Sequence, residues 1–143
     1  VSKASITTKS GHSDSIGQGL MILLGIESED HTEDIAWLSK KISNLRIFDD
    51  ERGIMNLSLK DIQGESMIVS QFTLQKKKKK GNRPSWIKAA PPEYAKSMYK
   101  KFLEQFEKDS GKKPKKGVFG DYMHIDLIND GPVTIIIDSK NKE

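Results

Sequence analysis

The chain has 143 residues, a formal net charge of +4 and no cysteine. Its length predicts a single domain over residues 1–143, and the lack of cysteine excludes disulfides, thiolate nucleophiles and cysteine-bound metals, which suits the reducing cytoplasm where we expect the protein. No apolar run approaches the roughly 20 residues that span a bilayer, so we expect no membrane partner.

The first part of the chain predicts two strands. Residues 1–6 alternate apolar and polar side chains as a strand does, and because no turn or cap precedes them we expect a few further residues before this strand. Residues 11–14 predict a turn. Residues 19–26 are a short apolar run bounded by glycines, which is typical of a buried strand.

A helix and a short strand follow. Asp30 and Glu33 form a capping-box pattern in which Asp replaces the usual Ser or Thr, and apolar residues then recur at helical spacing. We expect the helix to run from Thr32 to Asn44. Residues 46–48 predict a short strand and residues 49–53 a turn.

The middle of the chain combines a strand, a basic loop and a second helix. Residues 65–74 are rich in β-formers and predict a buried strand, whereas the sequence QKKKKKGNRP over residues 75–84 cannot bury anything and predicts a loop. Pro91-Pro92 then introduces an apolar stripe, so we expect a helix that ends near Ser110-Gly111. Residues 111–116 predict another basic loop.

The last stretch, residues 117–138, predicts two strands separated by the sequence NDGPVT (Asn129 to Thr134). The complete order β, β, α, β, β, α, β, β predicts an α+β fold. In this fold an antiparallel or mixed sheet is closed or covered by two helices.

Positive charge is concentrated in one part of the sequence. Residues 76–116 hold 15 of the 24 basic residues and 4 of the 20 acidic ones, a net charge of +11, whereas the rest of the chain has a net charge of −7. Such segregation can attract a polyanion, most often RNA or DNA. A solvated helix face beside a basic loop is the alternative explanation.

Familiar catalytic machinery is absent from the sequence. There is no nucleophile elbow, phosphate-binding glycine loop or dinucleotide fingerprint, and the three histidines, His12, His31 and His124, lack zinc-ligand spacing. We therefore expect neither a metal nor a cofactor. An enzyme of this composition has to work with backbone dipoles, hydroxyl groups and its own substrate.

Four segments resemble one family in order and spacing: SQFTL (Ser70 to Leu74), GNRPSW (Gly81 to Trp86), GVFGDYM (Gly117 to Met123) and NDGPVT. They are similar to those of the D-aminoacyl-tRNA deacylases, first described as D-tyrosyl-tRNA deacylases, and the similarity extends over essentially the whole chain. NDGPVT alone would be a weak signal, but four motifs in register are specific.

The resemblance implies a compact β-barrel-like fold with flanking helices, a homodimer with active sites at the interface, and hydrolysis of the ester between a D-amino acid and the 3′-terminal ribose of tRNA. It also implies that the Gly131-Pro132 bond is cis, that this dipeptide with Asn129 enters the partner's pocket, and that it rejects L side chains by steric clash. Glycine has no side chain to reject, so glycyl-tRNA mischarged on tRNA(Ala) is a further expected substrate. Aminoacyl-tRNA is the expected partner, and DNA is not.

Catalysis is expected around the first motif. Thr73 offers a hydroxyl on the predicted strand next to Phe72, but no base is recognisable nearby to activate it. The preferred mechanism therefore has the N–H groups of Phe72 and Thr73 hold the carbonyl oxygen while the tRNA 2′-hydroxyl assists a water molecule. Ser70 and Gln71 would shape or hydrogen-bond the two ends of the substrate, and a purely structural Thr73 is the alternative.

Further positions are carried over from the family. Ala89 corresponds to a small pocket residue, and Phe119 and Met123 are candidate adenosine contacts, although strand aromatics and methionines are more often core residues. Candidate contacts to the tRNA backbone are Lys79, Lys80 and Arg83. The five consecutive lysines of residues 76–80 depart from the family pattern, in which this loop carries one or two lysines among small and polar residues.

Two rival interpretations remain open at this point. The basic segment fits a non-catalytic RNA-binding module in which the Gly-Pro turn is purely architectural. A related deacylase with a trans Gly-Pro bond accepts certain L-amino acids, but its first motif normally differs from the SQFTL of this chain.

Overall fold

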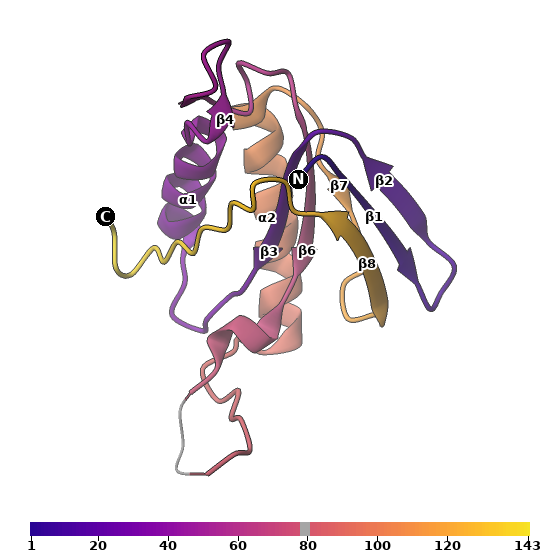
Figure 1. Ribbon diagram of the computed structural model, residues 1–143. Coiled ribbons are helices and arrows are strands. Elements are labelled where there is room, and N and C mark those ends of the chain that lie inside the picture. Colours follow the sequence, from indigo (N-terminus) through magenta and orange to yellow (C-terminus); the bar gives the residue numbers. More distant parts are fainter. Residues whose placement is uncertain (78–80) are drawn as a thin grey trace.

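The computed structural model describes residues 1–77 and 81–143. Two α-helices, one short 3₁₀ helix and three small sheets make up the described part of the chain (Figure 1). In chain order the elements are β1 (Lys3–Thr8), β2 (Ser13–Ile16), β3 (Gly19–Leu24), α1 (Thr32–Asn44), β4 (Phe48–Asp49), β5 (Met55–Leu57), β6 (Glu65–Ser70), η1 (Phe72–Gln75), α2 (Pro92–Ser110), β7 (Lys115–Lys116) and β8 (Met123–Ile128).

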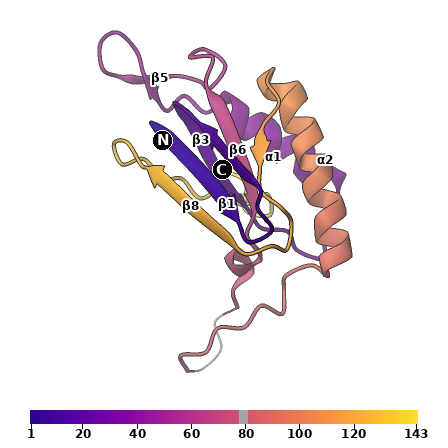
Figure 2. The same ribbon diagram turned by 90° about the vertical axis from the view of Figure 1, so that its right-hand side faces the viewer.

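The elements form three layers. An antiparallel sheet of order β2-β1-β8 packs on a parallel sheet of order β3-β6-β7, and α1 and α2 cover the other side of the parallel sheet (Figure 2). Strands β4 and β5 form a separate hairpin. The fold is therefore α+β with mixed sheets, as the sequence predicts.

Strand β6 lies at the centre of this arrangement because both of its faces are buried. Met67 and Val69 face the antiparallel sheet, where Ile6 is their fully buried partner. Ile68 faces the helices and packs with a cluster that includes Phe102 and Phe106 of α2. This alternation follows from the two-residue period of a strand, which sends successive side chains to opposite faces.

The ends of both helices are close to those predicted. α2 starts at Pro92, where proline needs no intrahelical donor, and it ends before Gly111, which has φ +81° in the left-handed region. α1 spans the predicted residues, but its capping box is formed by His31 and Asp34 rather than by Asp30 and Glu33. Asp30 instead accepts a hydrogen bond from the N–H of Glu27 at 2.8 Å.

Two predicted strands need correction, and three observed strands were not predicted. The strand expected over residues 65–74 stops at Ser70, because residues 72–75 turn into η1. The apolar run 19–26 forms the edge strand β3, and it is not buried throughout, because Leu23 is 45% exposed. Two short strands, β2 and β5, were not predicted at all, and β7 lies in a segment expected to be a loop.

The expected barrel and the last strand are also wrong. The sheets are open within the described residues, because β3 has only β6 as a neighbour and β2 has only β1. Residues 133–137, expected to form a strand after NDGPVT, have no strand structure. They cross the outer side of β3 instead, and Ile136 is 91% exposed.

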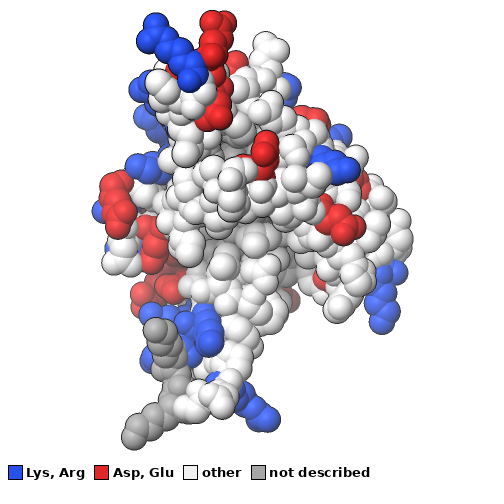
Figure 3. All heavy atoms as spheres, viewed as in Figure 1, with Lys and Arg blue, Asp and Glu red and all other residues white. Residues whose placement is uncertain are grey.

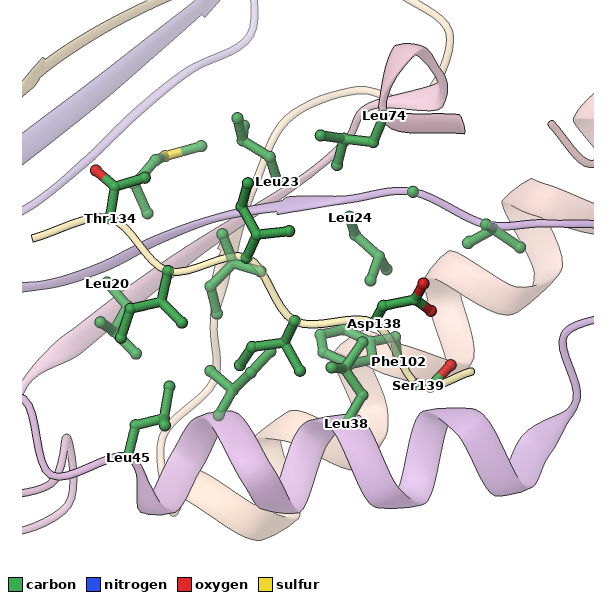
Figure 4. A pocket seen from close by; sticks show the side chains of 18 of the residues that line it. Leu20, Leu23, Leu24, Leu38, Leu45, Leu74, Phe102, Thr134, Asp138 and Ser139 are labelled. Carbon is green, nitrogen blue, oxygen red and sulfur yellow. The ribbon is translucent and has the colours of Figure 1, made fainter. Parts of the chain in front are cut away.

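The C-terminal segment covers a largely apolar cavity of about 630 Å³ between β3 and α1 (Figure 4). Lys140 anchors the segment, with its Nζ 3.0 Å from Asp34 Oδ2 and 3.7 Å from Asp30 Oδ1. Partial burial opposes ionisation of Asp34, but hydrogen bonds from the His31 backbone and from Lys140 outweigh it and lower the pKa of Asp34 to about 2. Among the described residues, neither α1 nor α2 combines the length and the apolar character that a membrane-spanning helix needs.

Candidate active site

The chain turns sharply at the end of β6, and this turn contains the first motif. The Gln71 N–H donates to the Leu24 carbonyl at 2.8 Å, and the Leu74 N–H donates to the Gln71 carbonyl at 3.2 Å, which begins η1. The first N–H groups of a helical turn have no partner inside it. Accordingly, the N–H groups of Phe72 and Thr73 make no hydrogen bond within the part of the chain that the structure describes.

Thr73 thus lies on a 3₁₀ turn and not on the strand that the sequence predicts. Its hydroxyl contacts the side-chain amide of Gln71, which donates a hydrogen bond to it. An amide cannot take the proton of a hydroxyl at neutral pH. The geometry therefore offers two adjacent main-chain donors, whereas the Thr73 hydroxyl has no activating base among its described hydrogen-bond partners.

Gly25 allows η1 to approach the end of β3. A Cβ atom at this position would lie 3.0 Å from both Leu74 Cβ and Gln75 Nε2, and 3.3 Å from the Gln71 carbonyl oxygen. These contacts are tighter than ordinary packing, so a Cβ at this position requires the neighbouring atoms of Gln71 and η1 to give way by a few tenths of an ångström. Gly25 is therefore a structural determinant of the candidate site that is not among the four motifs. The sequence does place it near the end of the apolar run 19–26, where a strand is expected to end.

The second motif returns to the same region. The Lys77 N–H donates to the Ser85 carbonyl at 2.8 Å, and the Trp86 ring meets the Phe72 ring edge to face with centroids 5.7 Å apart. Ala89 then pairs with Glu27 just beyond β3. The structure therefore places Ala89 just beyond the end of β3 where Gln71 is also bound, and its role in a pocket stays a prediction.

The candidate adenosine contacts belong partly to the core. Phe119 packs on Tyr99 with ring centroids 6.0 Å apart, and the Tyr99 hydroxyl donates to the Ile68 carbonyl of β6 at 2.5 Å. Burial raises the pKa of Tyr99 to about 12, so it stays a neutral donor. Met123 packs against the cluster between the two sheets. Both candidates are only partly buried, so each keeps some accessible surface.

The Gly131-Pro132 peptide bond is cis, and Gly131 has φ +129°. The Asn129 amide donates to the Thr134 hydroxyl at 2.8 Å and closes the loop around this dipeptide. The loop leaves β8 next to Val1, whose carbonyl accepts from the Gly19 N–H at the start of β3.

The Gly-Pro loop and η1 are therefore attached to opposite ends of β3. The loop lies near Gly19, whereas Ser70 pairs with Leu24 at the other end of the strand. Five steps along a strand span roughly 17 Å. Within one chain the dipeptide consequently lies away from the SQFTL turn, and Figure 1 shows the chain leaving β8 at the end of the molecule opposite to the short helix that follows β6.

Several exposed basic side chains lie near the site. Arg83 lies on the loop beyond η1 with Lys76, Lys77 and Lys88, and blue side chains gather at this lower end of the molecule in Figure 3. Lys79 and Lys80 fall outside the described residues. Within the described residues no group of three or more His, Cys, Asp or Glu side chains could hold a metal ion.

Comparison with known proteins decides the family. Residues 1–138 match the family described as D-Tyr-tRNA(Tyr) deacylase. The chain belongs to this family. Relatives named D-aminoacyl-tRNA deacylase include one from Flavobacterium psychrophilum, 60% identical over 100% of this chain and 95% of the relative, and one from Parabacteroides distasonis, 56% identical with the same coverage.

Solved structures support the fold of this deacylase. A protein titled c-Myc DNA Unwinding Element Binding Protein is 44% identical, with a TM-score of 0.86 over 94% of this chain and 91% of that one. A probable eukaryotic D-amino acid tRNA deacylase is only 15% identical but has a TM-score of 0.71 over 87% of both chains. The second match supports the fold alone. By family and by its close relatives the chain is an enzyme, a D-aminoacyl-tRNA deacylase.

We predict that Gly25→Ala lowers deacylase activity by at least about tenfold, because the added methyl group requires η1 to move. Activity on D-tyrosyl-tRNA and thermal unfolding would be measured together. Gly17→Ala is the matched control, since a Cβ there meets only Glu65 Oε1 at 3.5 Å. Full activity of Gly25→Ala would contradict the need for close approach.

Proposed function

We propose that this chain hydrolyses the ester of D-aminoacyl-tRNA and releases a free D-amino acid and tRNA. The observation that carries the proposal is the pair of unpaired N–H groups at the start of η1, within the motif that links the chain to its family. Two adjacent donors suit the oxyanion of a tetrahedral intermediate, in which negative charge develops on the former carbonyl oxygen.

In the proposed mechanism the Phe72 and Thr73 N–H groups bind the carbonyl oxygen of the ester. A water molecule, oriented by the 2′-hydroxyl of the terminal ribose, adds to the carbonyl carbon. The bond from that carbon to the 3′-oxygen then breaks, and the proton lost by the water reaches the 3′-oxygen. The hydrogen bond from the Gln71 N–H to the Leu24 carbonyl holds the start of this turn in place.

We further propose that two copies of the chain build each active site, with Gly131-Pro132 of one copy entering the pocket of the other and rejecting L side chains. The separation of this dipeptide from its own SQFTL turn by the length of β3 supports an arrangement between copies.

The surface around the loop supports the same arrangement. Leu127, Ile128, Ile135 and Ile136 are between 46% and 91% exposed there, and the middle of this face carries few charges (Figure 3). Contiguous exposed apolar side chains commonly mark an interface between proteins.

Steric selection has defined consequences for substrates. A main-chain obstacle cannot rotate away as a long side chain can, and each tenfold of discrimination requires about 1.4 kcal/mol. Glycine presents no side chain to this obstacle, so glycyl-tRNA mischarged on tRNA(Ala) belongs to the proposed substrates. The proposed location is the cytoplasm, where aminoacyl-tRNA is made and used.

The principal alternative is a nucleic-acid-binding module without catalysis. The exposed basic side chains near η1 favour it, and the 44% identical structure is titled as a binding protein for a DNA unwinding element. A measurement of hydrolysis separates this alternative from the proposed function.

We expect the protein to hydrolyse D-tyrosyl-tRNA at least about 100-fold faster than L-tyrosyl-tRNA, because only the L side chain meets the Gly131-Pro132 main chain. Release of the amino acid is followed with labelled substrate at matched concentrations. Equal cleavage of both substrates would reject the steric selection, and inertness toward both would leave the binding module.

Thr73→Ala is expected to keep activity within about threefold of the unchanged chain, since a backbone N–H survives the substitution. Loss of a covalent nucleophile typically costs on the order of 10⁴-fold or more in rate. The rate constant for D-tyrosyl-tRNA at saturation is the measurement. A fall to the uncatalysed rate would restore the hydroxyl as the nucleophile.

Mixed dimers test whether the site is shared between copies. Gly131→Ala is the second variant needed, because Gly131 has φ +129° and an added Cβ would lie 2.8 Å from Val133 Cγ2, so the loop has to shift. Differently tagged Gly25→Ala and Gly131→Ala chains are co-expressed and purified by both tags in turn.

A shared site predicts that the mixed dimer recovers about half of the normal D-selective activity, since one of its two sites combines an intact turn with an intact loop. Sites contained within one chain predict no recovery. Failure of the two tags to purify together, with both variants folded, would exclude the dimer.

A further inference from the structure

Three large side chains at η1 and just beyond it form a patch that remains accessible to solvent in the folded chain. Phe72 is 56% exposed, Ile87 is 70% exposed, and Trp86 is half-buried against the Phe72 ring. We call these three residues the Trp86 patch. Apolar surface left in water forgoes the stabilisation that burial would give, so a contiguous patch of this kind indicates a ligand or partner.

Trp86 and Ile87 of the patch lie between two main-chain hydrogen bonds that hold their segment in place. The Lys77 N–H donates to the Ser85 carbonyl, and beyond the patch the Ala90 N–H donates to the Ile26 carbonyl at 3.0 Å. The patch is thereby fixed directly beside the unpaired N–H groups of η1. It is a preformed surface at the mouth of the candidate active site.

Exposed cations lie close to the patch along the chain. Lys77, Arg83 and Lys88 are exposed, and none of them forms a salt bridge with a described residue. An apolar platform with a basic rim is complementary to single-stranded RNA, whose bases stack on aromatic rings while its phosphates meet cations. A second copy of this chain fits less well, because a symmetric contact would bring the same cations together.

The position of the patch selects a particular part of the RNA. A tRNA ends in an unpaired CCA sequence, and under the proposed function the ester on its final adenosine lies at η1. The nucleotides just before that adenosine then have to leave along the surface next to η1. The Trp86 patch is the aromatic surface that adjoins η1.

We propose that the Trp86 patch stacks the unpaired base that precedes the 3′-terminal adenosine of tRNA, while Lys77, Arg83 and Lys88 meet the neighbouring phosphates. This inference rests on the proposed function. It assigns the patch to affinity for the tRNA end and leaves the ester chemistry to η1.

The test compares a complete and a truncated substrate. We expect Trp86→Ala to raise KM for D-tyrosyl-tRNA by about tenfold, the effect typical of losing one base stack, with kcat nearly unchanged. For 3′-O-D-tyrosyl-adenosine, which lacks the preceding nucleotide, both constants should stay within about twofold. Trp86→Phe retains a ring and should stay near the unchanged chain.

Trp37→Ala is the matched control, because Trp37 is the other tryptophan of the chain and is also half-buried, but lies on α1 beneath Lys142. It should leave KM for both substrates unchanged. Three results for Trp86→Ala would overturn the inference. These are an unchanged KM for D-tyrosyl-tRNA, an altered oligomeric state, or an equal loss of activity on both substrates. The last result would mean that Trp86 supports the structure of η1.

A binding measurement separates this inference from the proposed function. In a Trp37→Phe background Trp86 is the single tryptophan, and an uncharged RNA hairpin ending in unpaired CCA should quench its fluorescence, whereas the same hairpin with a blunt end should not. Quenching with no hydrolysis of any substrate would reject the proposed function and support RNA stacking on the Trp86 patch. Hydrolysis of D-tyrosyl-tRNA without such quenching would support the proposed function and reject stacking on the patch.

Discussion

The parallel pairing of β3 with β6 is the constraint on which the candidate site depends. It ends at Leu24 and Ser70, and the next donor along the chain, the Gln71 N–H, still reaches the Leu24 carbonyl. From this fixed point the chain has to turn, and η1 follows at once. Gly25 lets that turn press against the end of β3, so backbone geometry alone orients the N–H groups of Phe72 and Thr73.

The layers around this pair of strands keep it rigid. β6 is buried on both faces, by the antiparallel sheet on one side and by α2 on the other. The Tyr99 hydroxyl adds a buried hydrogen bond to the Ile68 carbonyl only two residues before Ser70. A site made of main-chain donors needs such support, because its precision equals the precision of the backbone that carries it.

Sequence reasoning predicted the helices and the strands with strong periodicity, and it failed where tertiary contacts override local preference. SQFTL reads as a continuation of β6, yet the chain turns after Ser70 because its neighbour β3 ends at Leu24. The run after Pro132 has good strand composition, but no neighbouring strand pairs with it in the described chain. The motifs indicate the region of the candidate site, whereas the close approach of η1 to Gly25 is visible only in the folded chain.

A site built from main-chain donors constrains sequence variation differently from a site built from side chains. Every residue except proline carries an N–H group, so side-chain replacement at Phe72 or Thr73 leaves these donors in place. Selection on such a centre therefore acts on chain shape and not on side-chain identity at the donors. Alanine substitutions in η1 would therefore change the rate of ester hydrolysis little. Inactivating substitutions would instead occur at neighbours such as Gly25, which hold the peptide planes in their orientation.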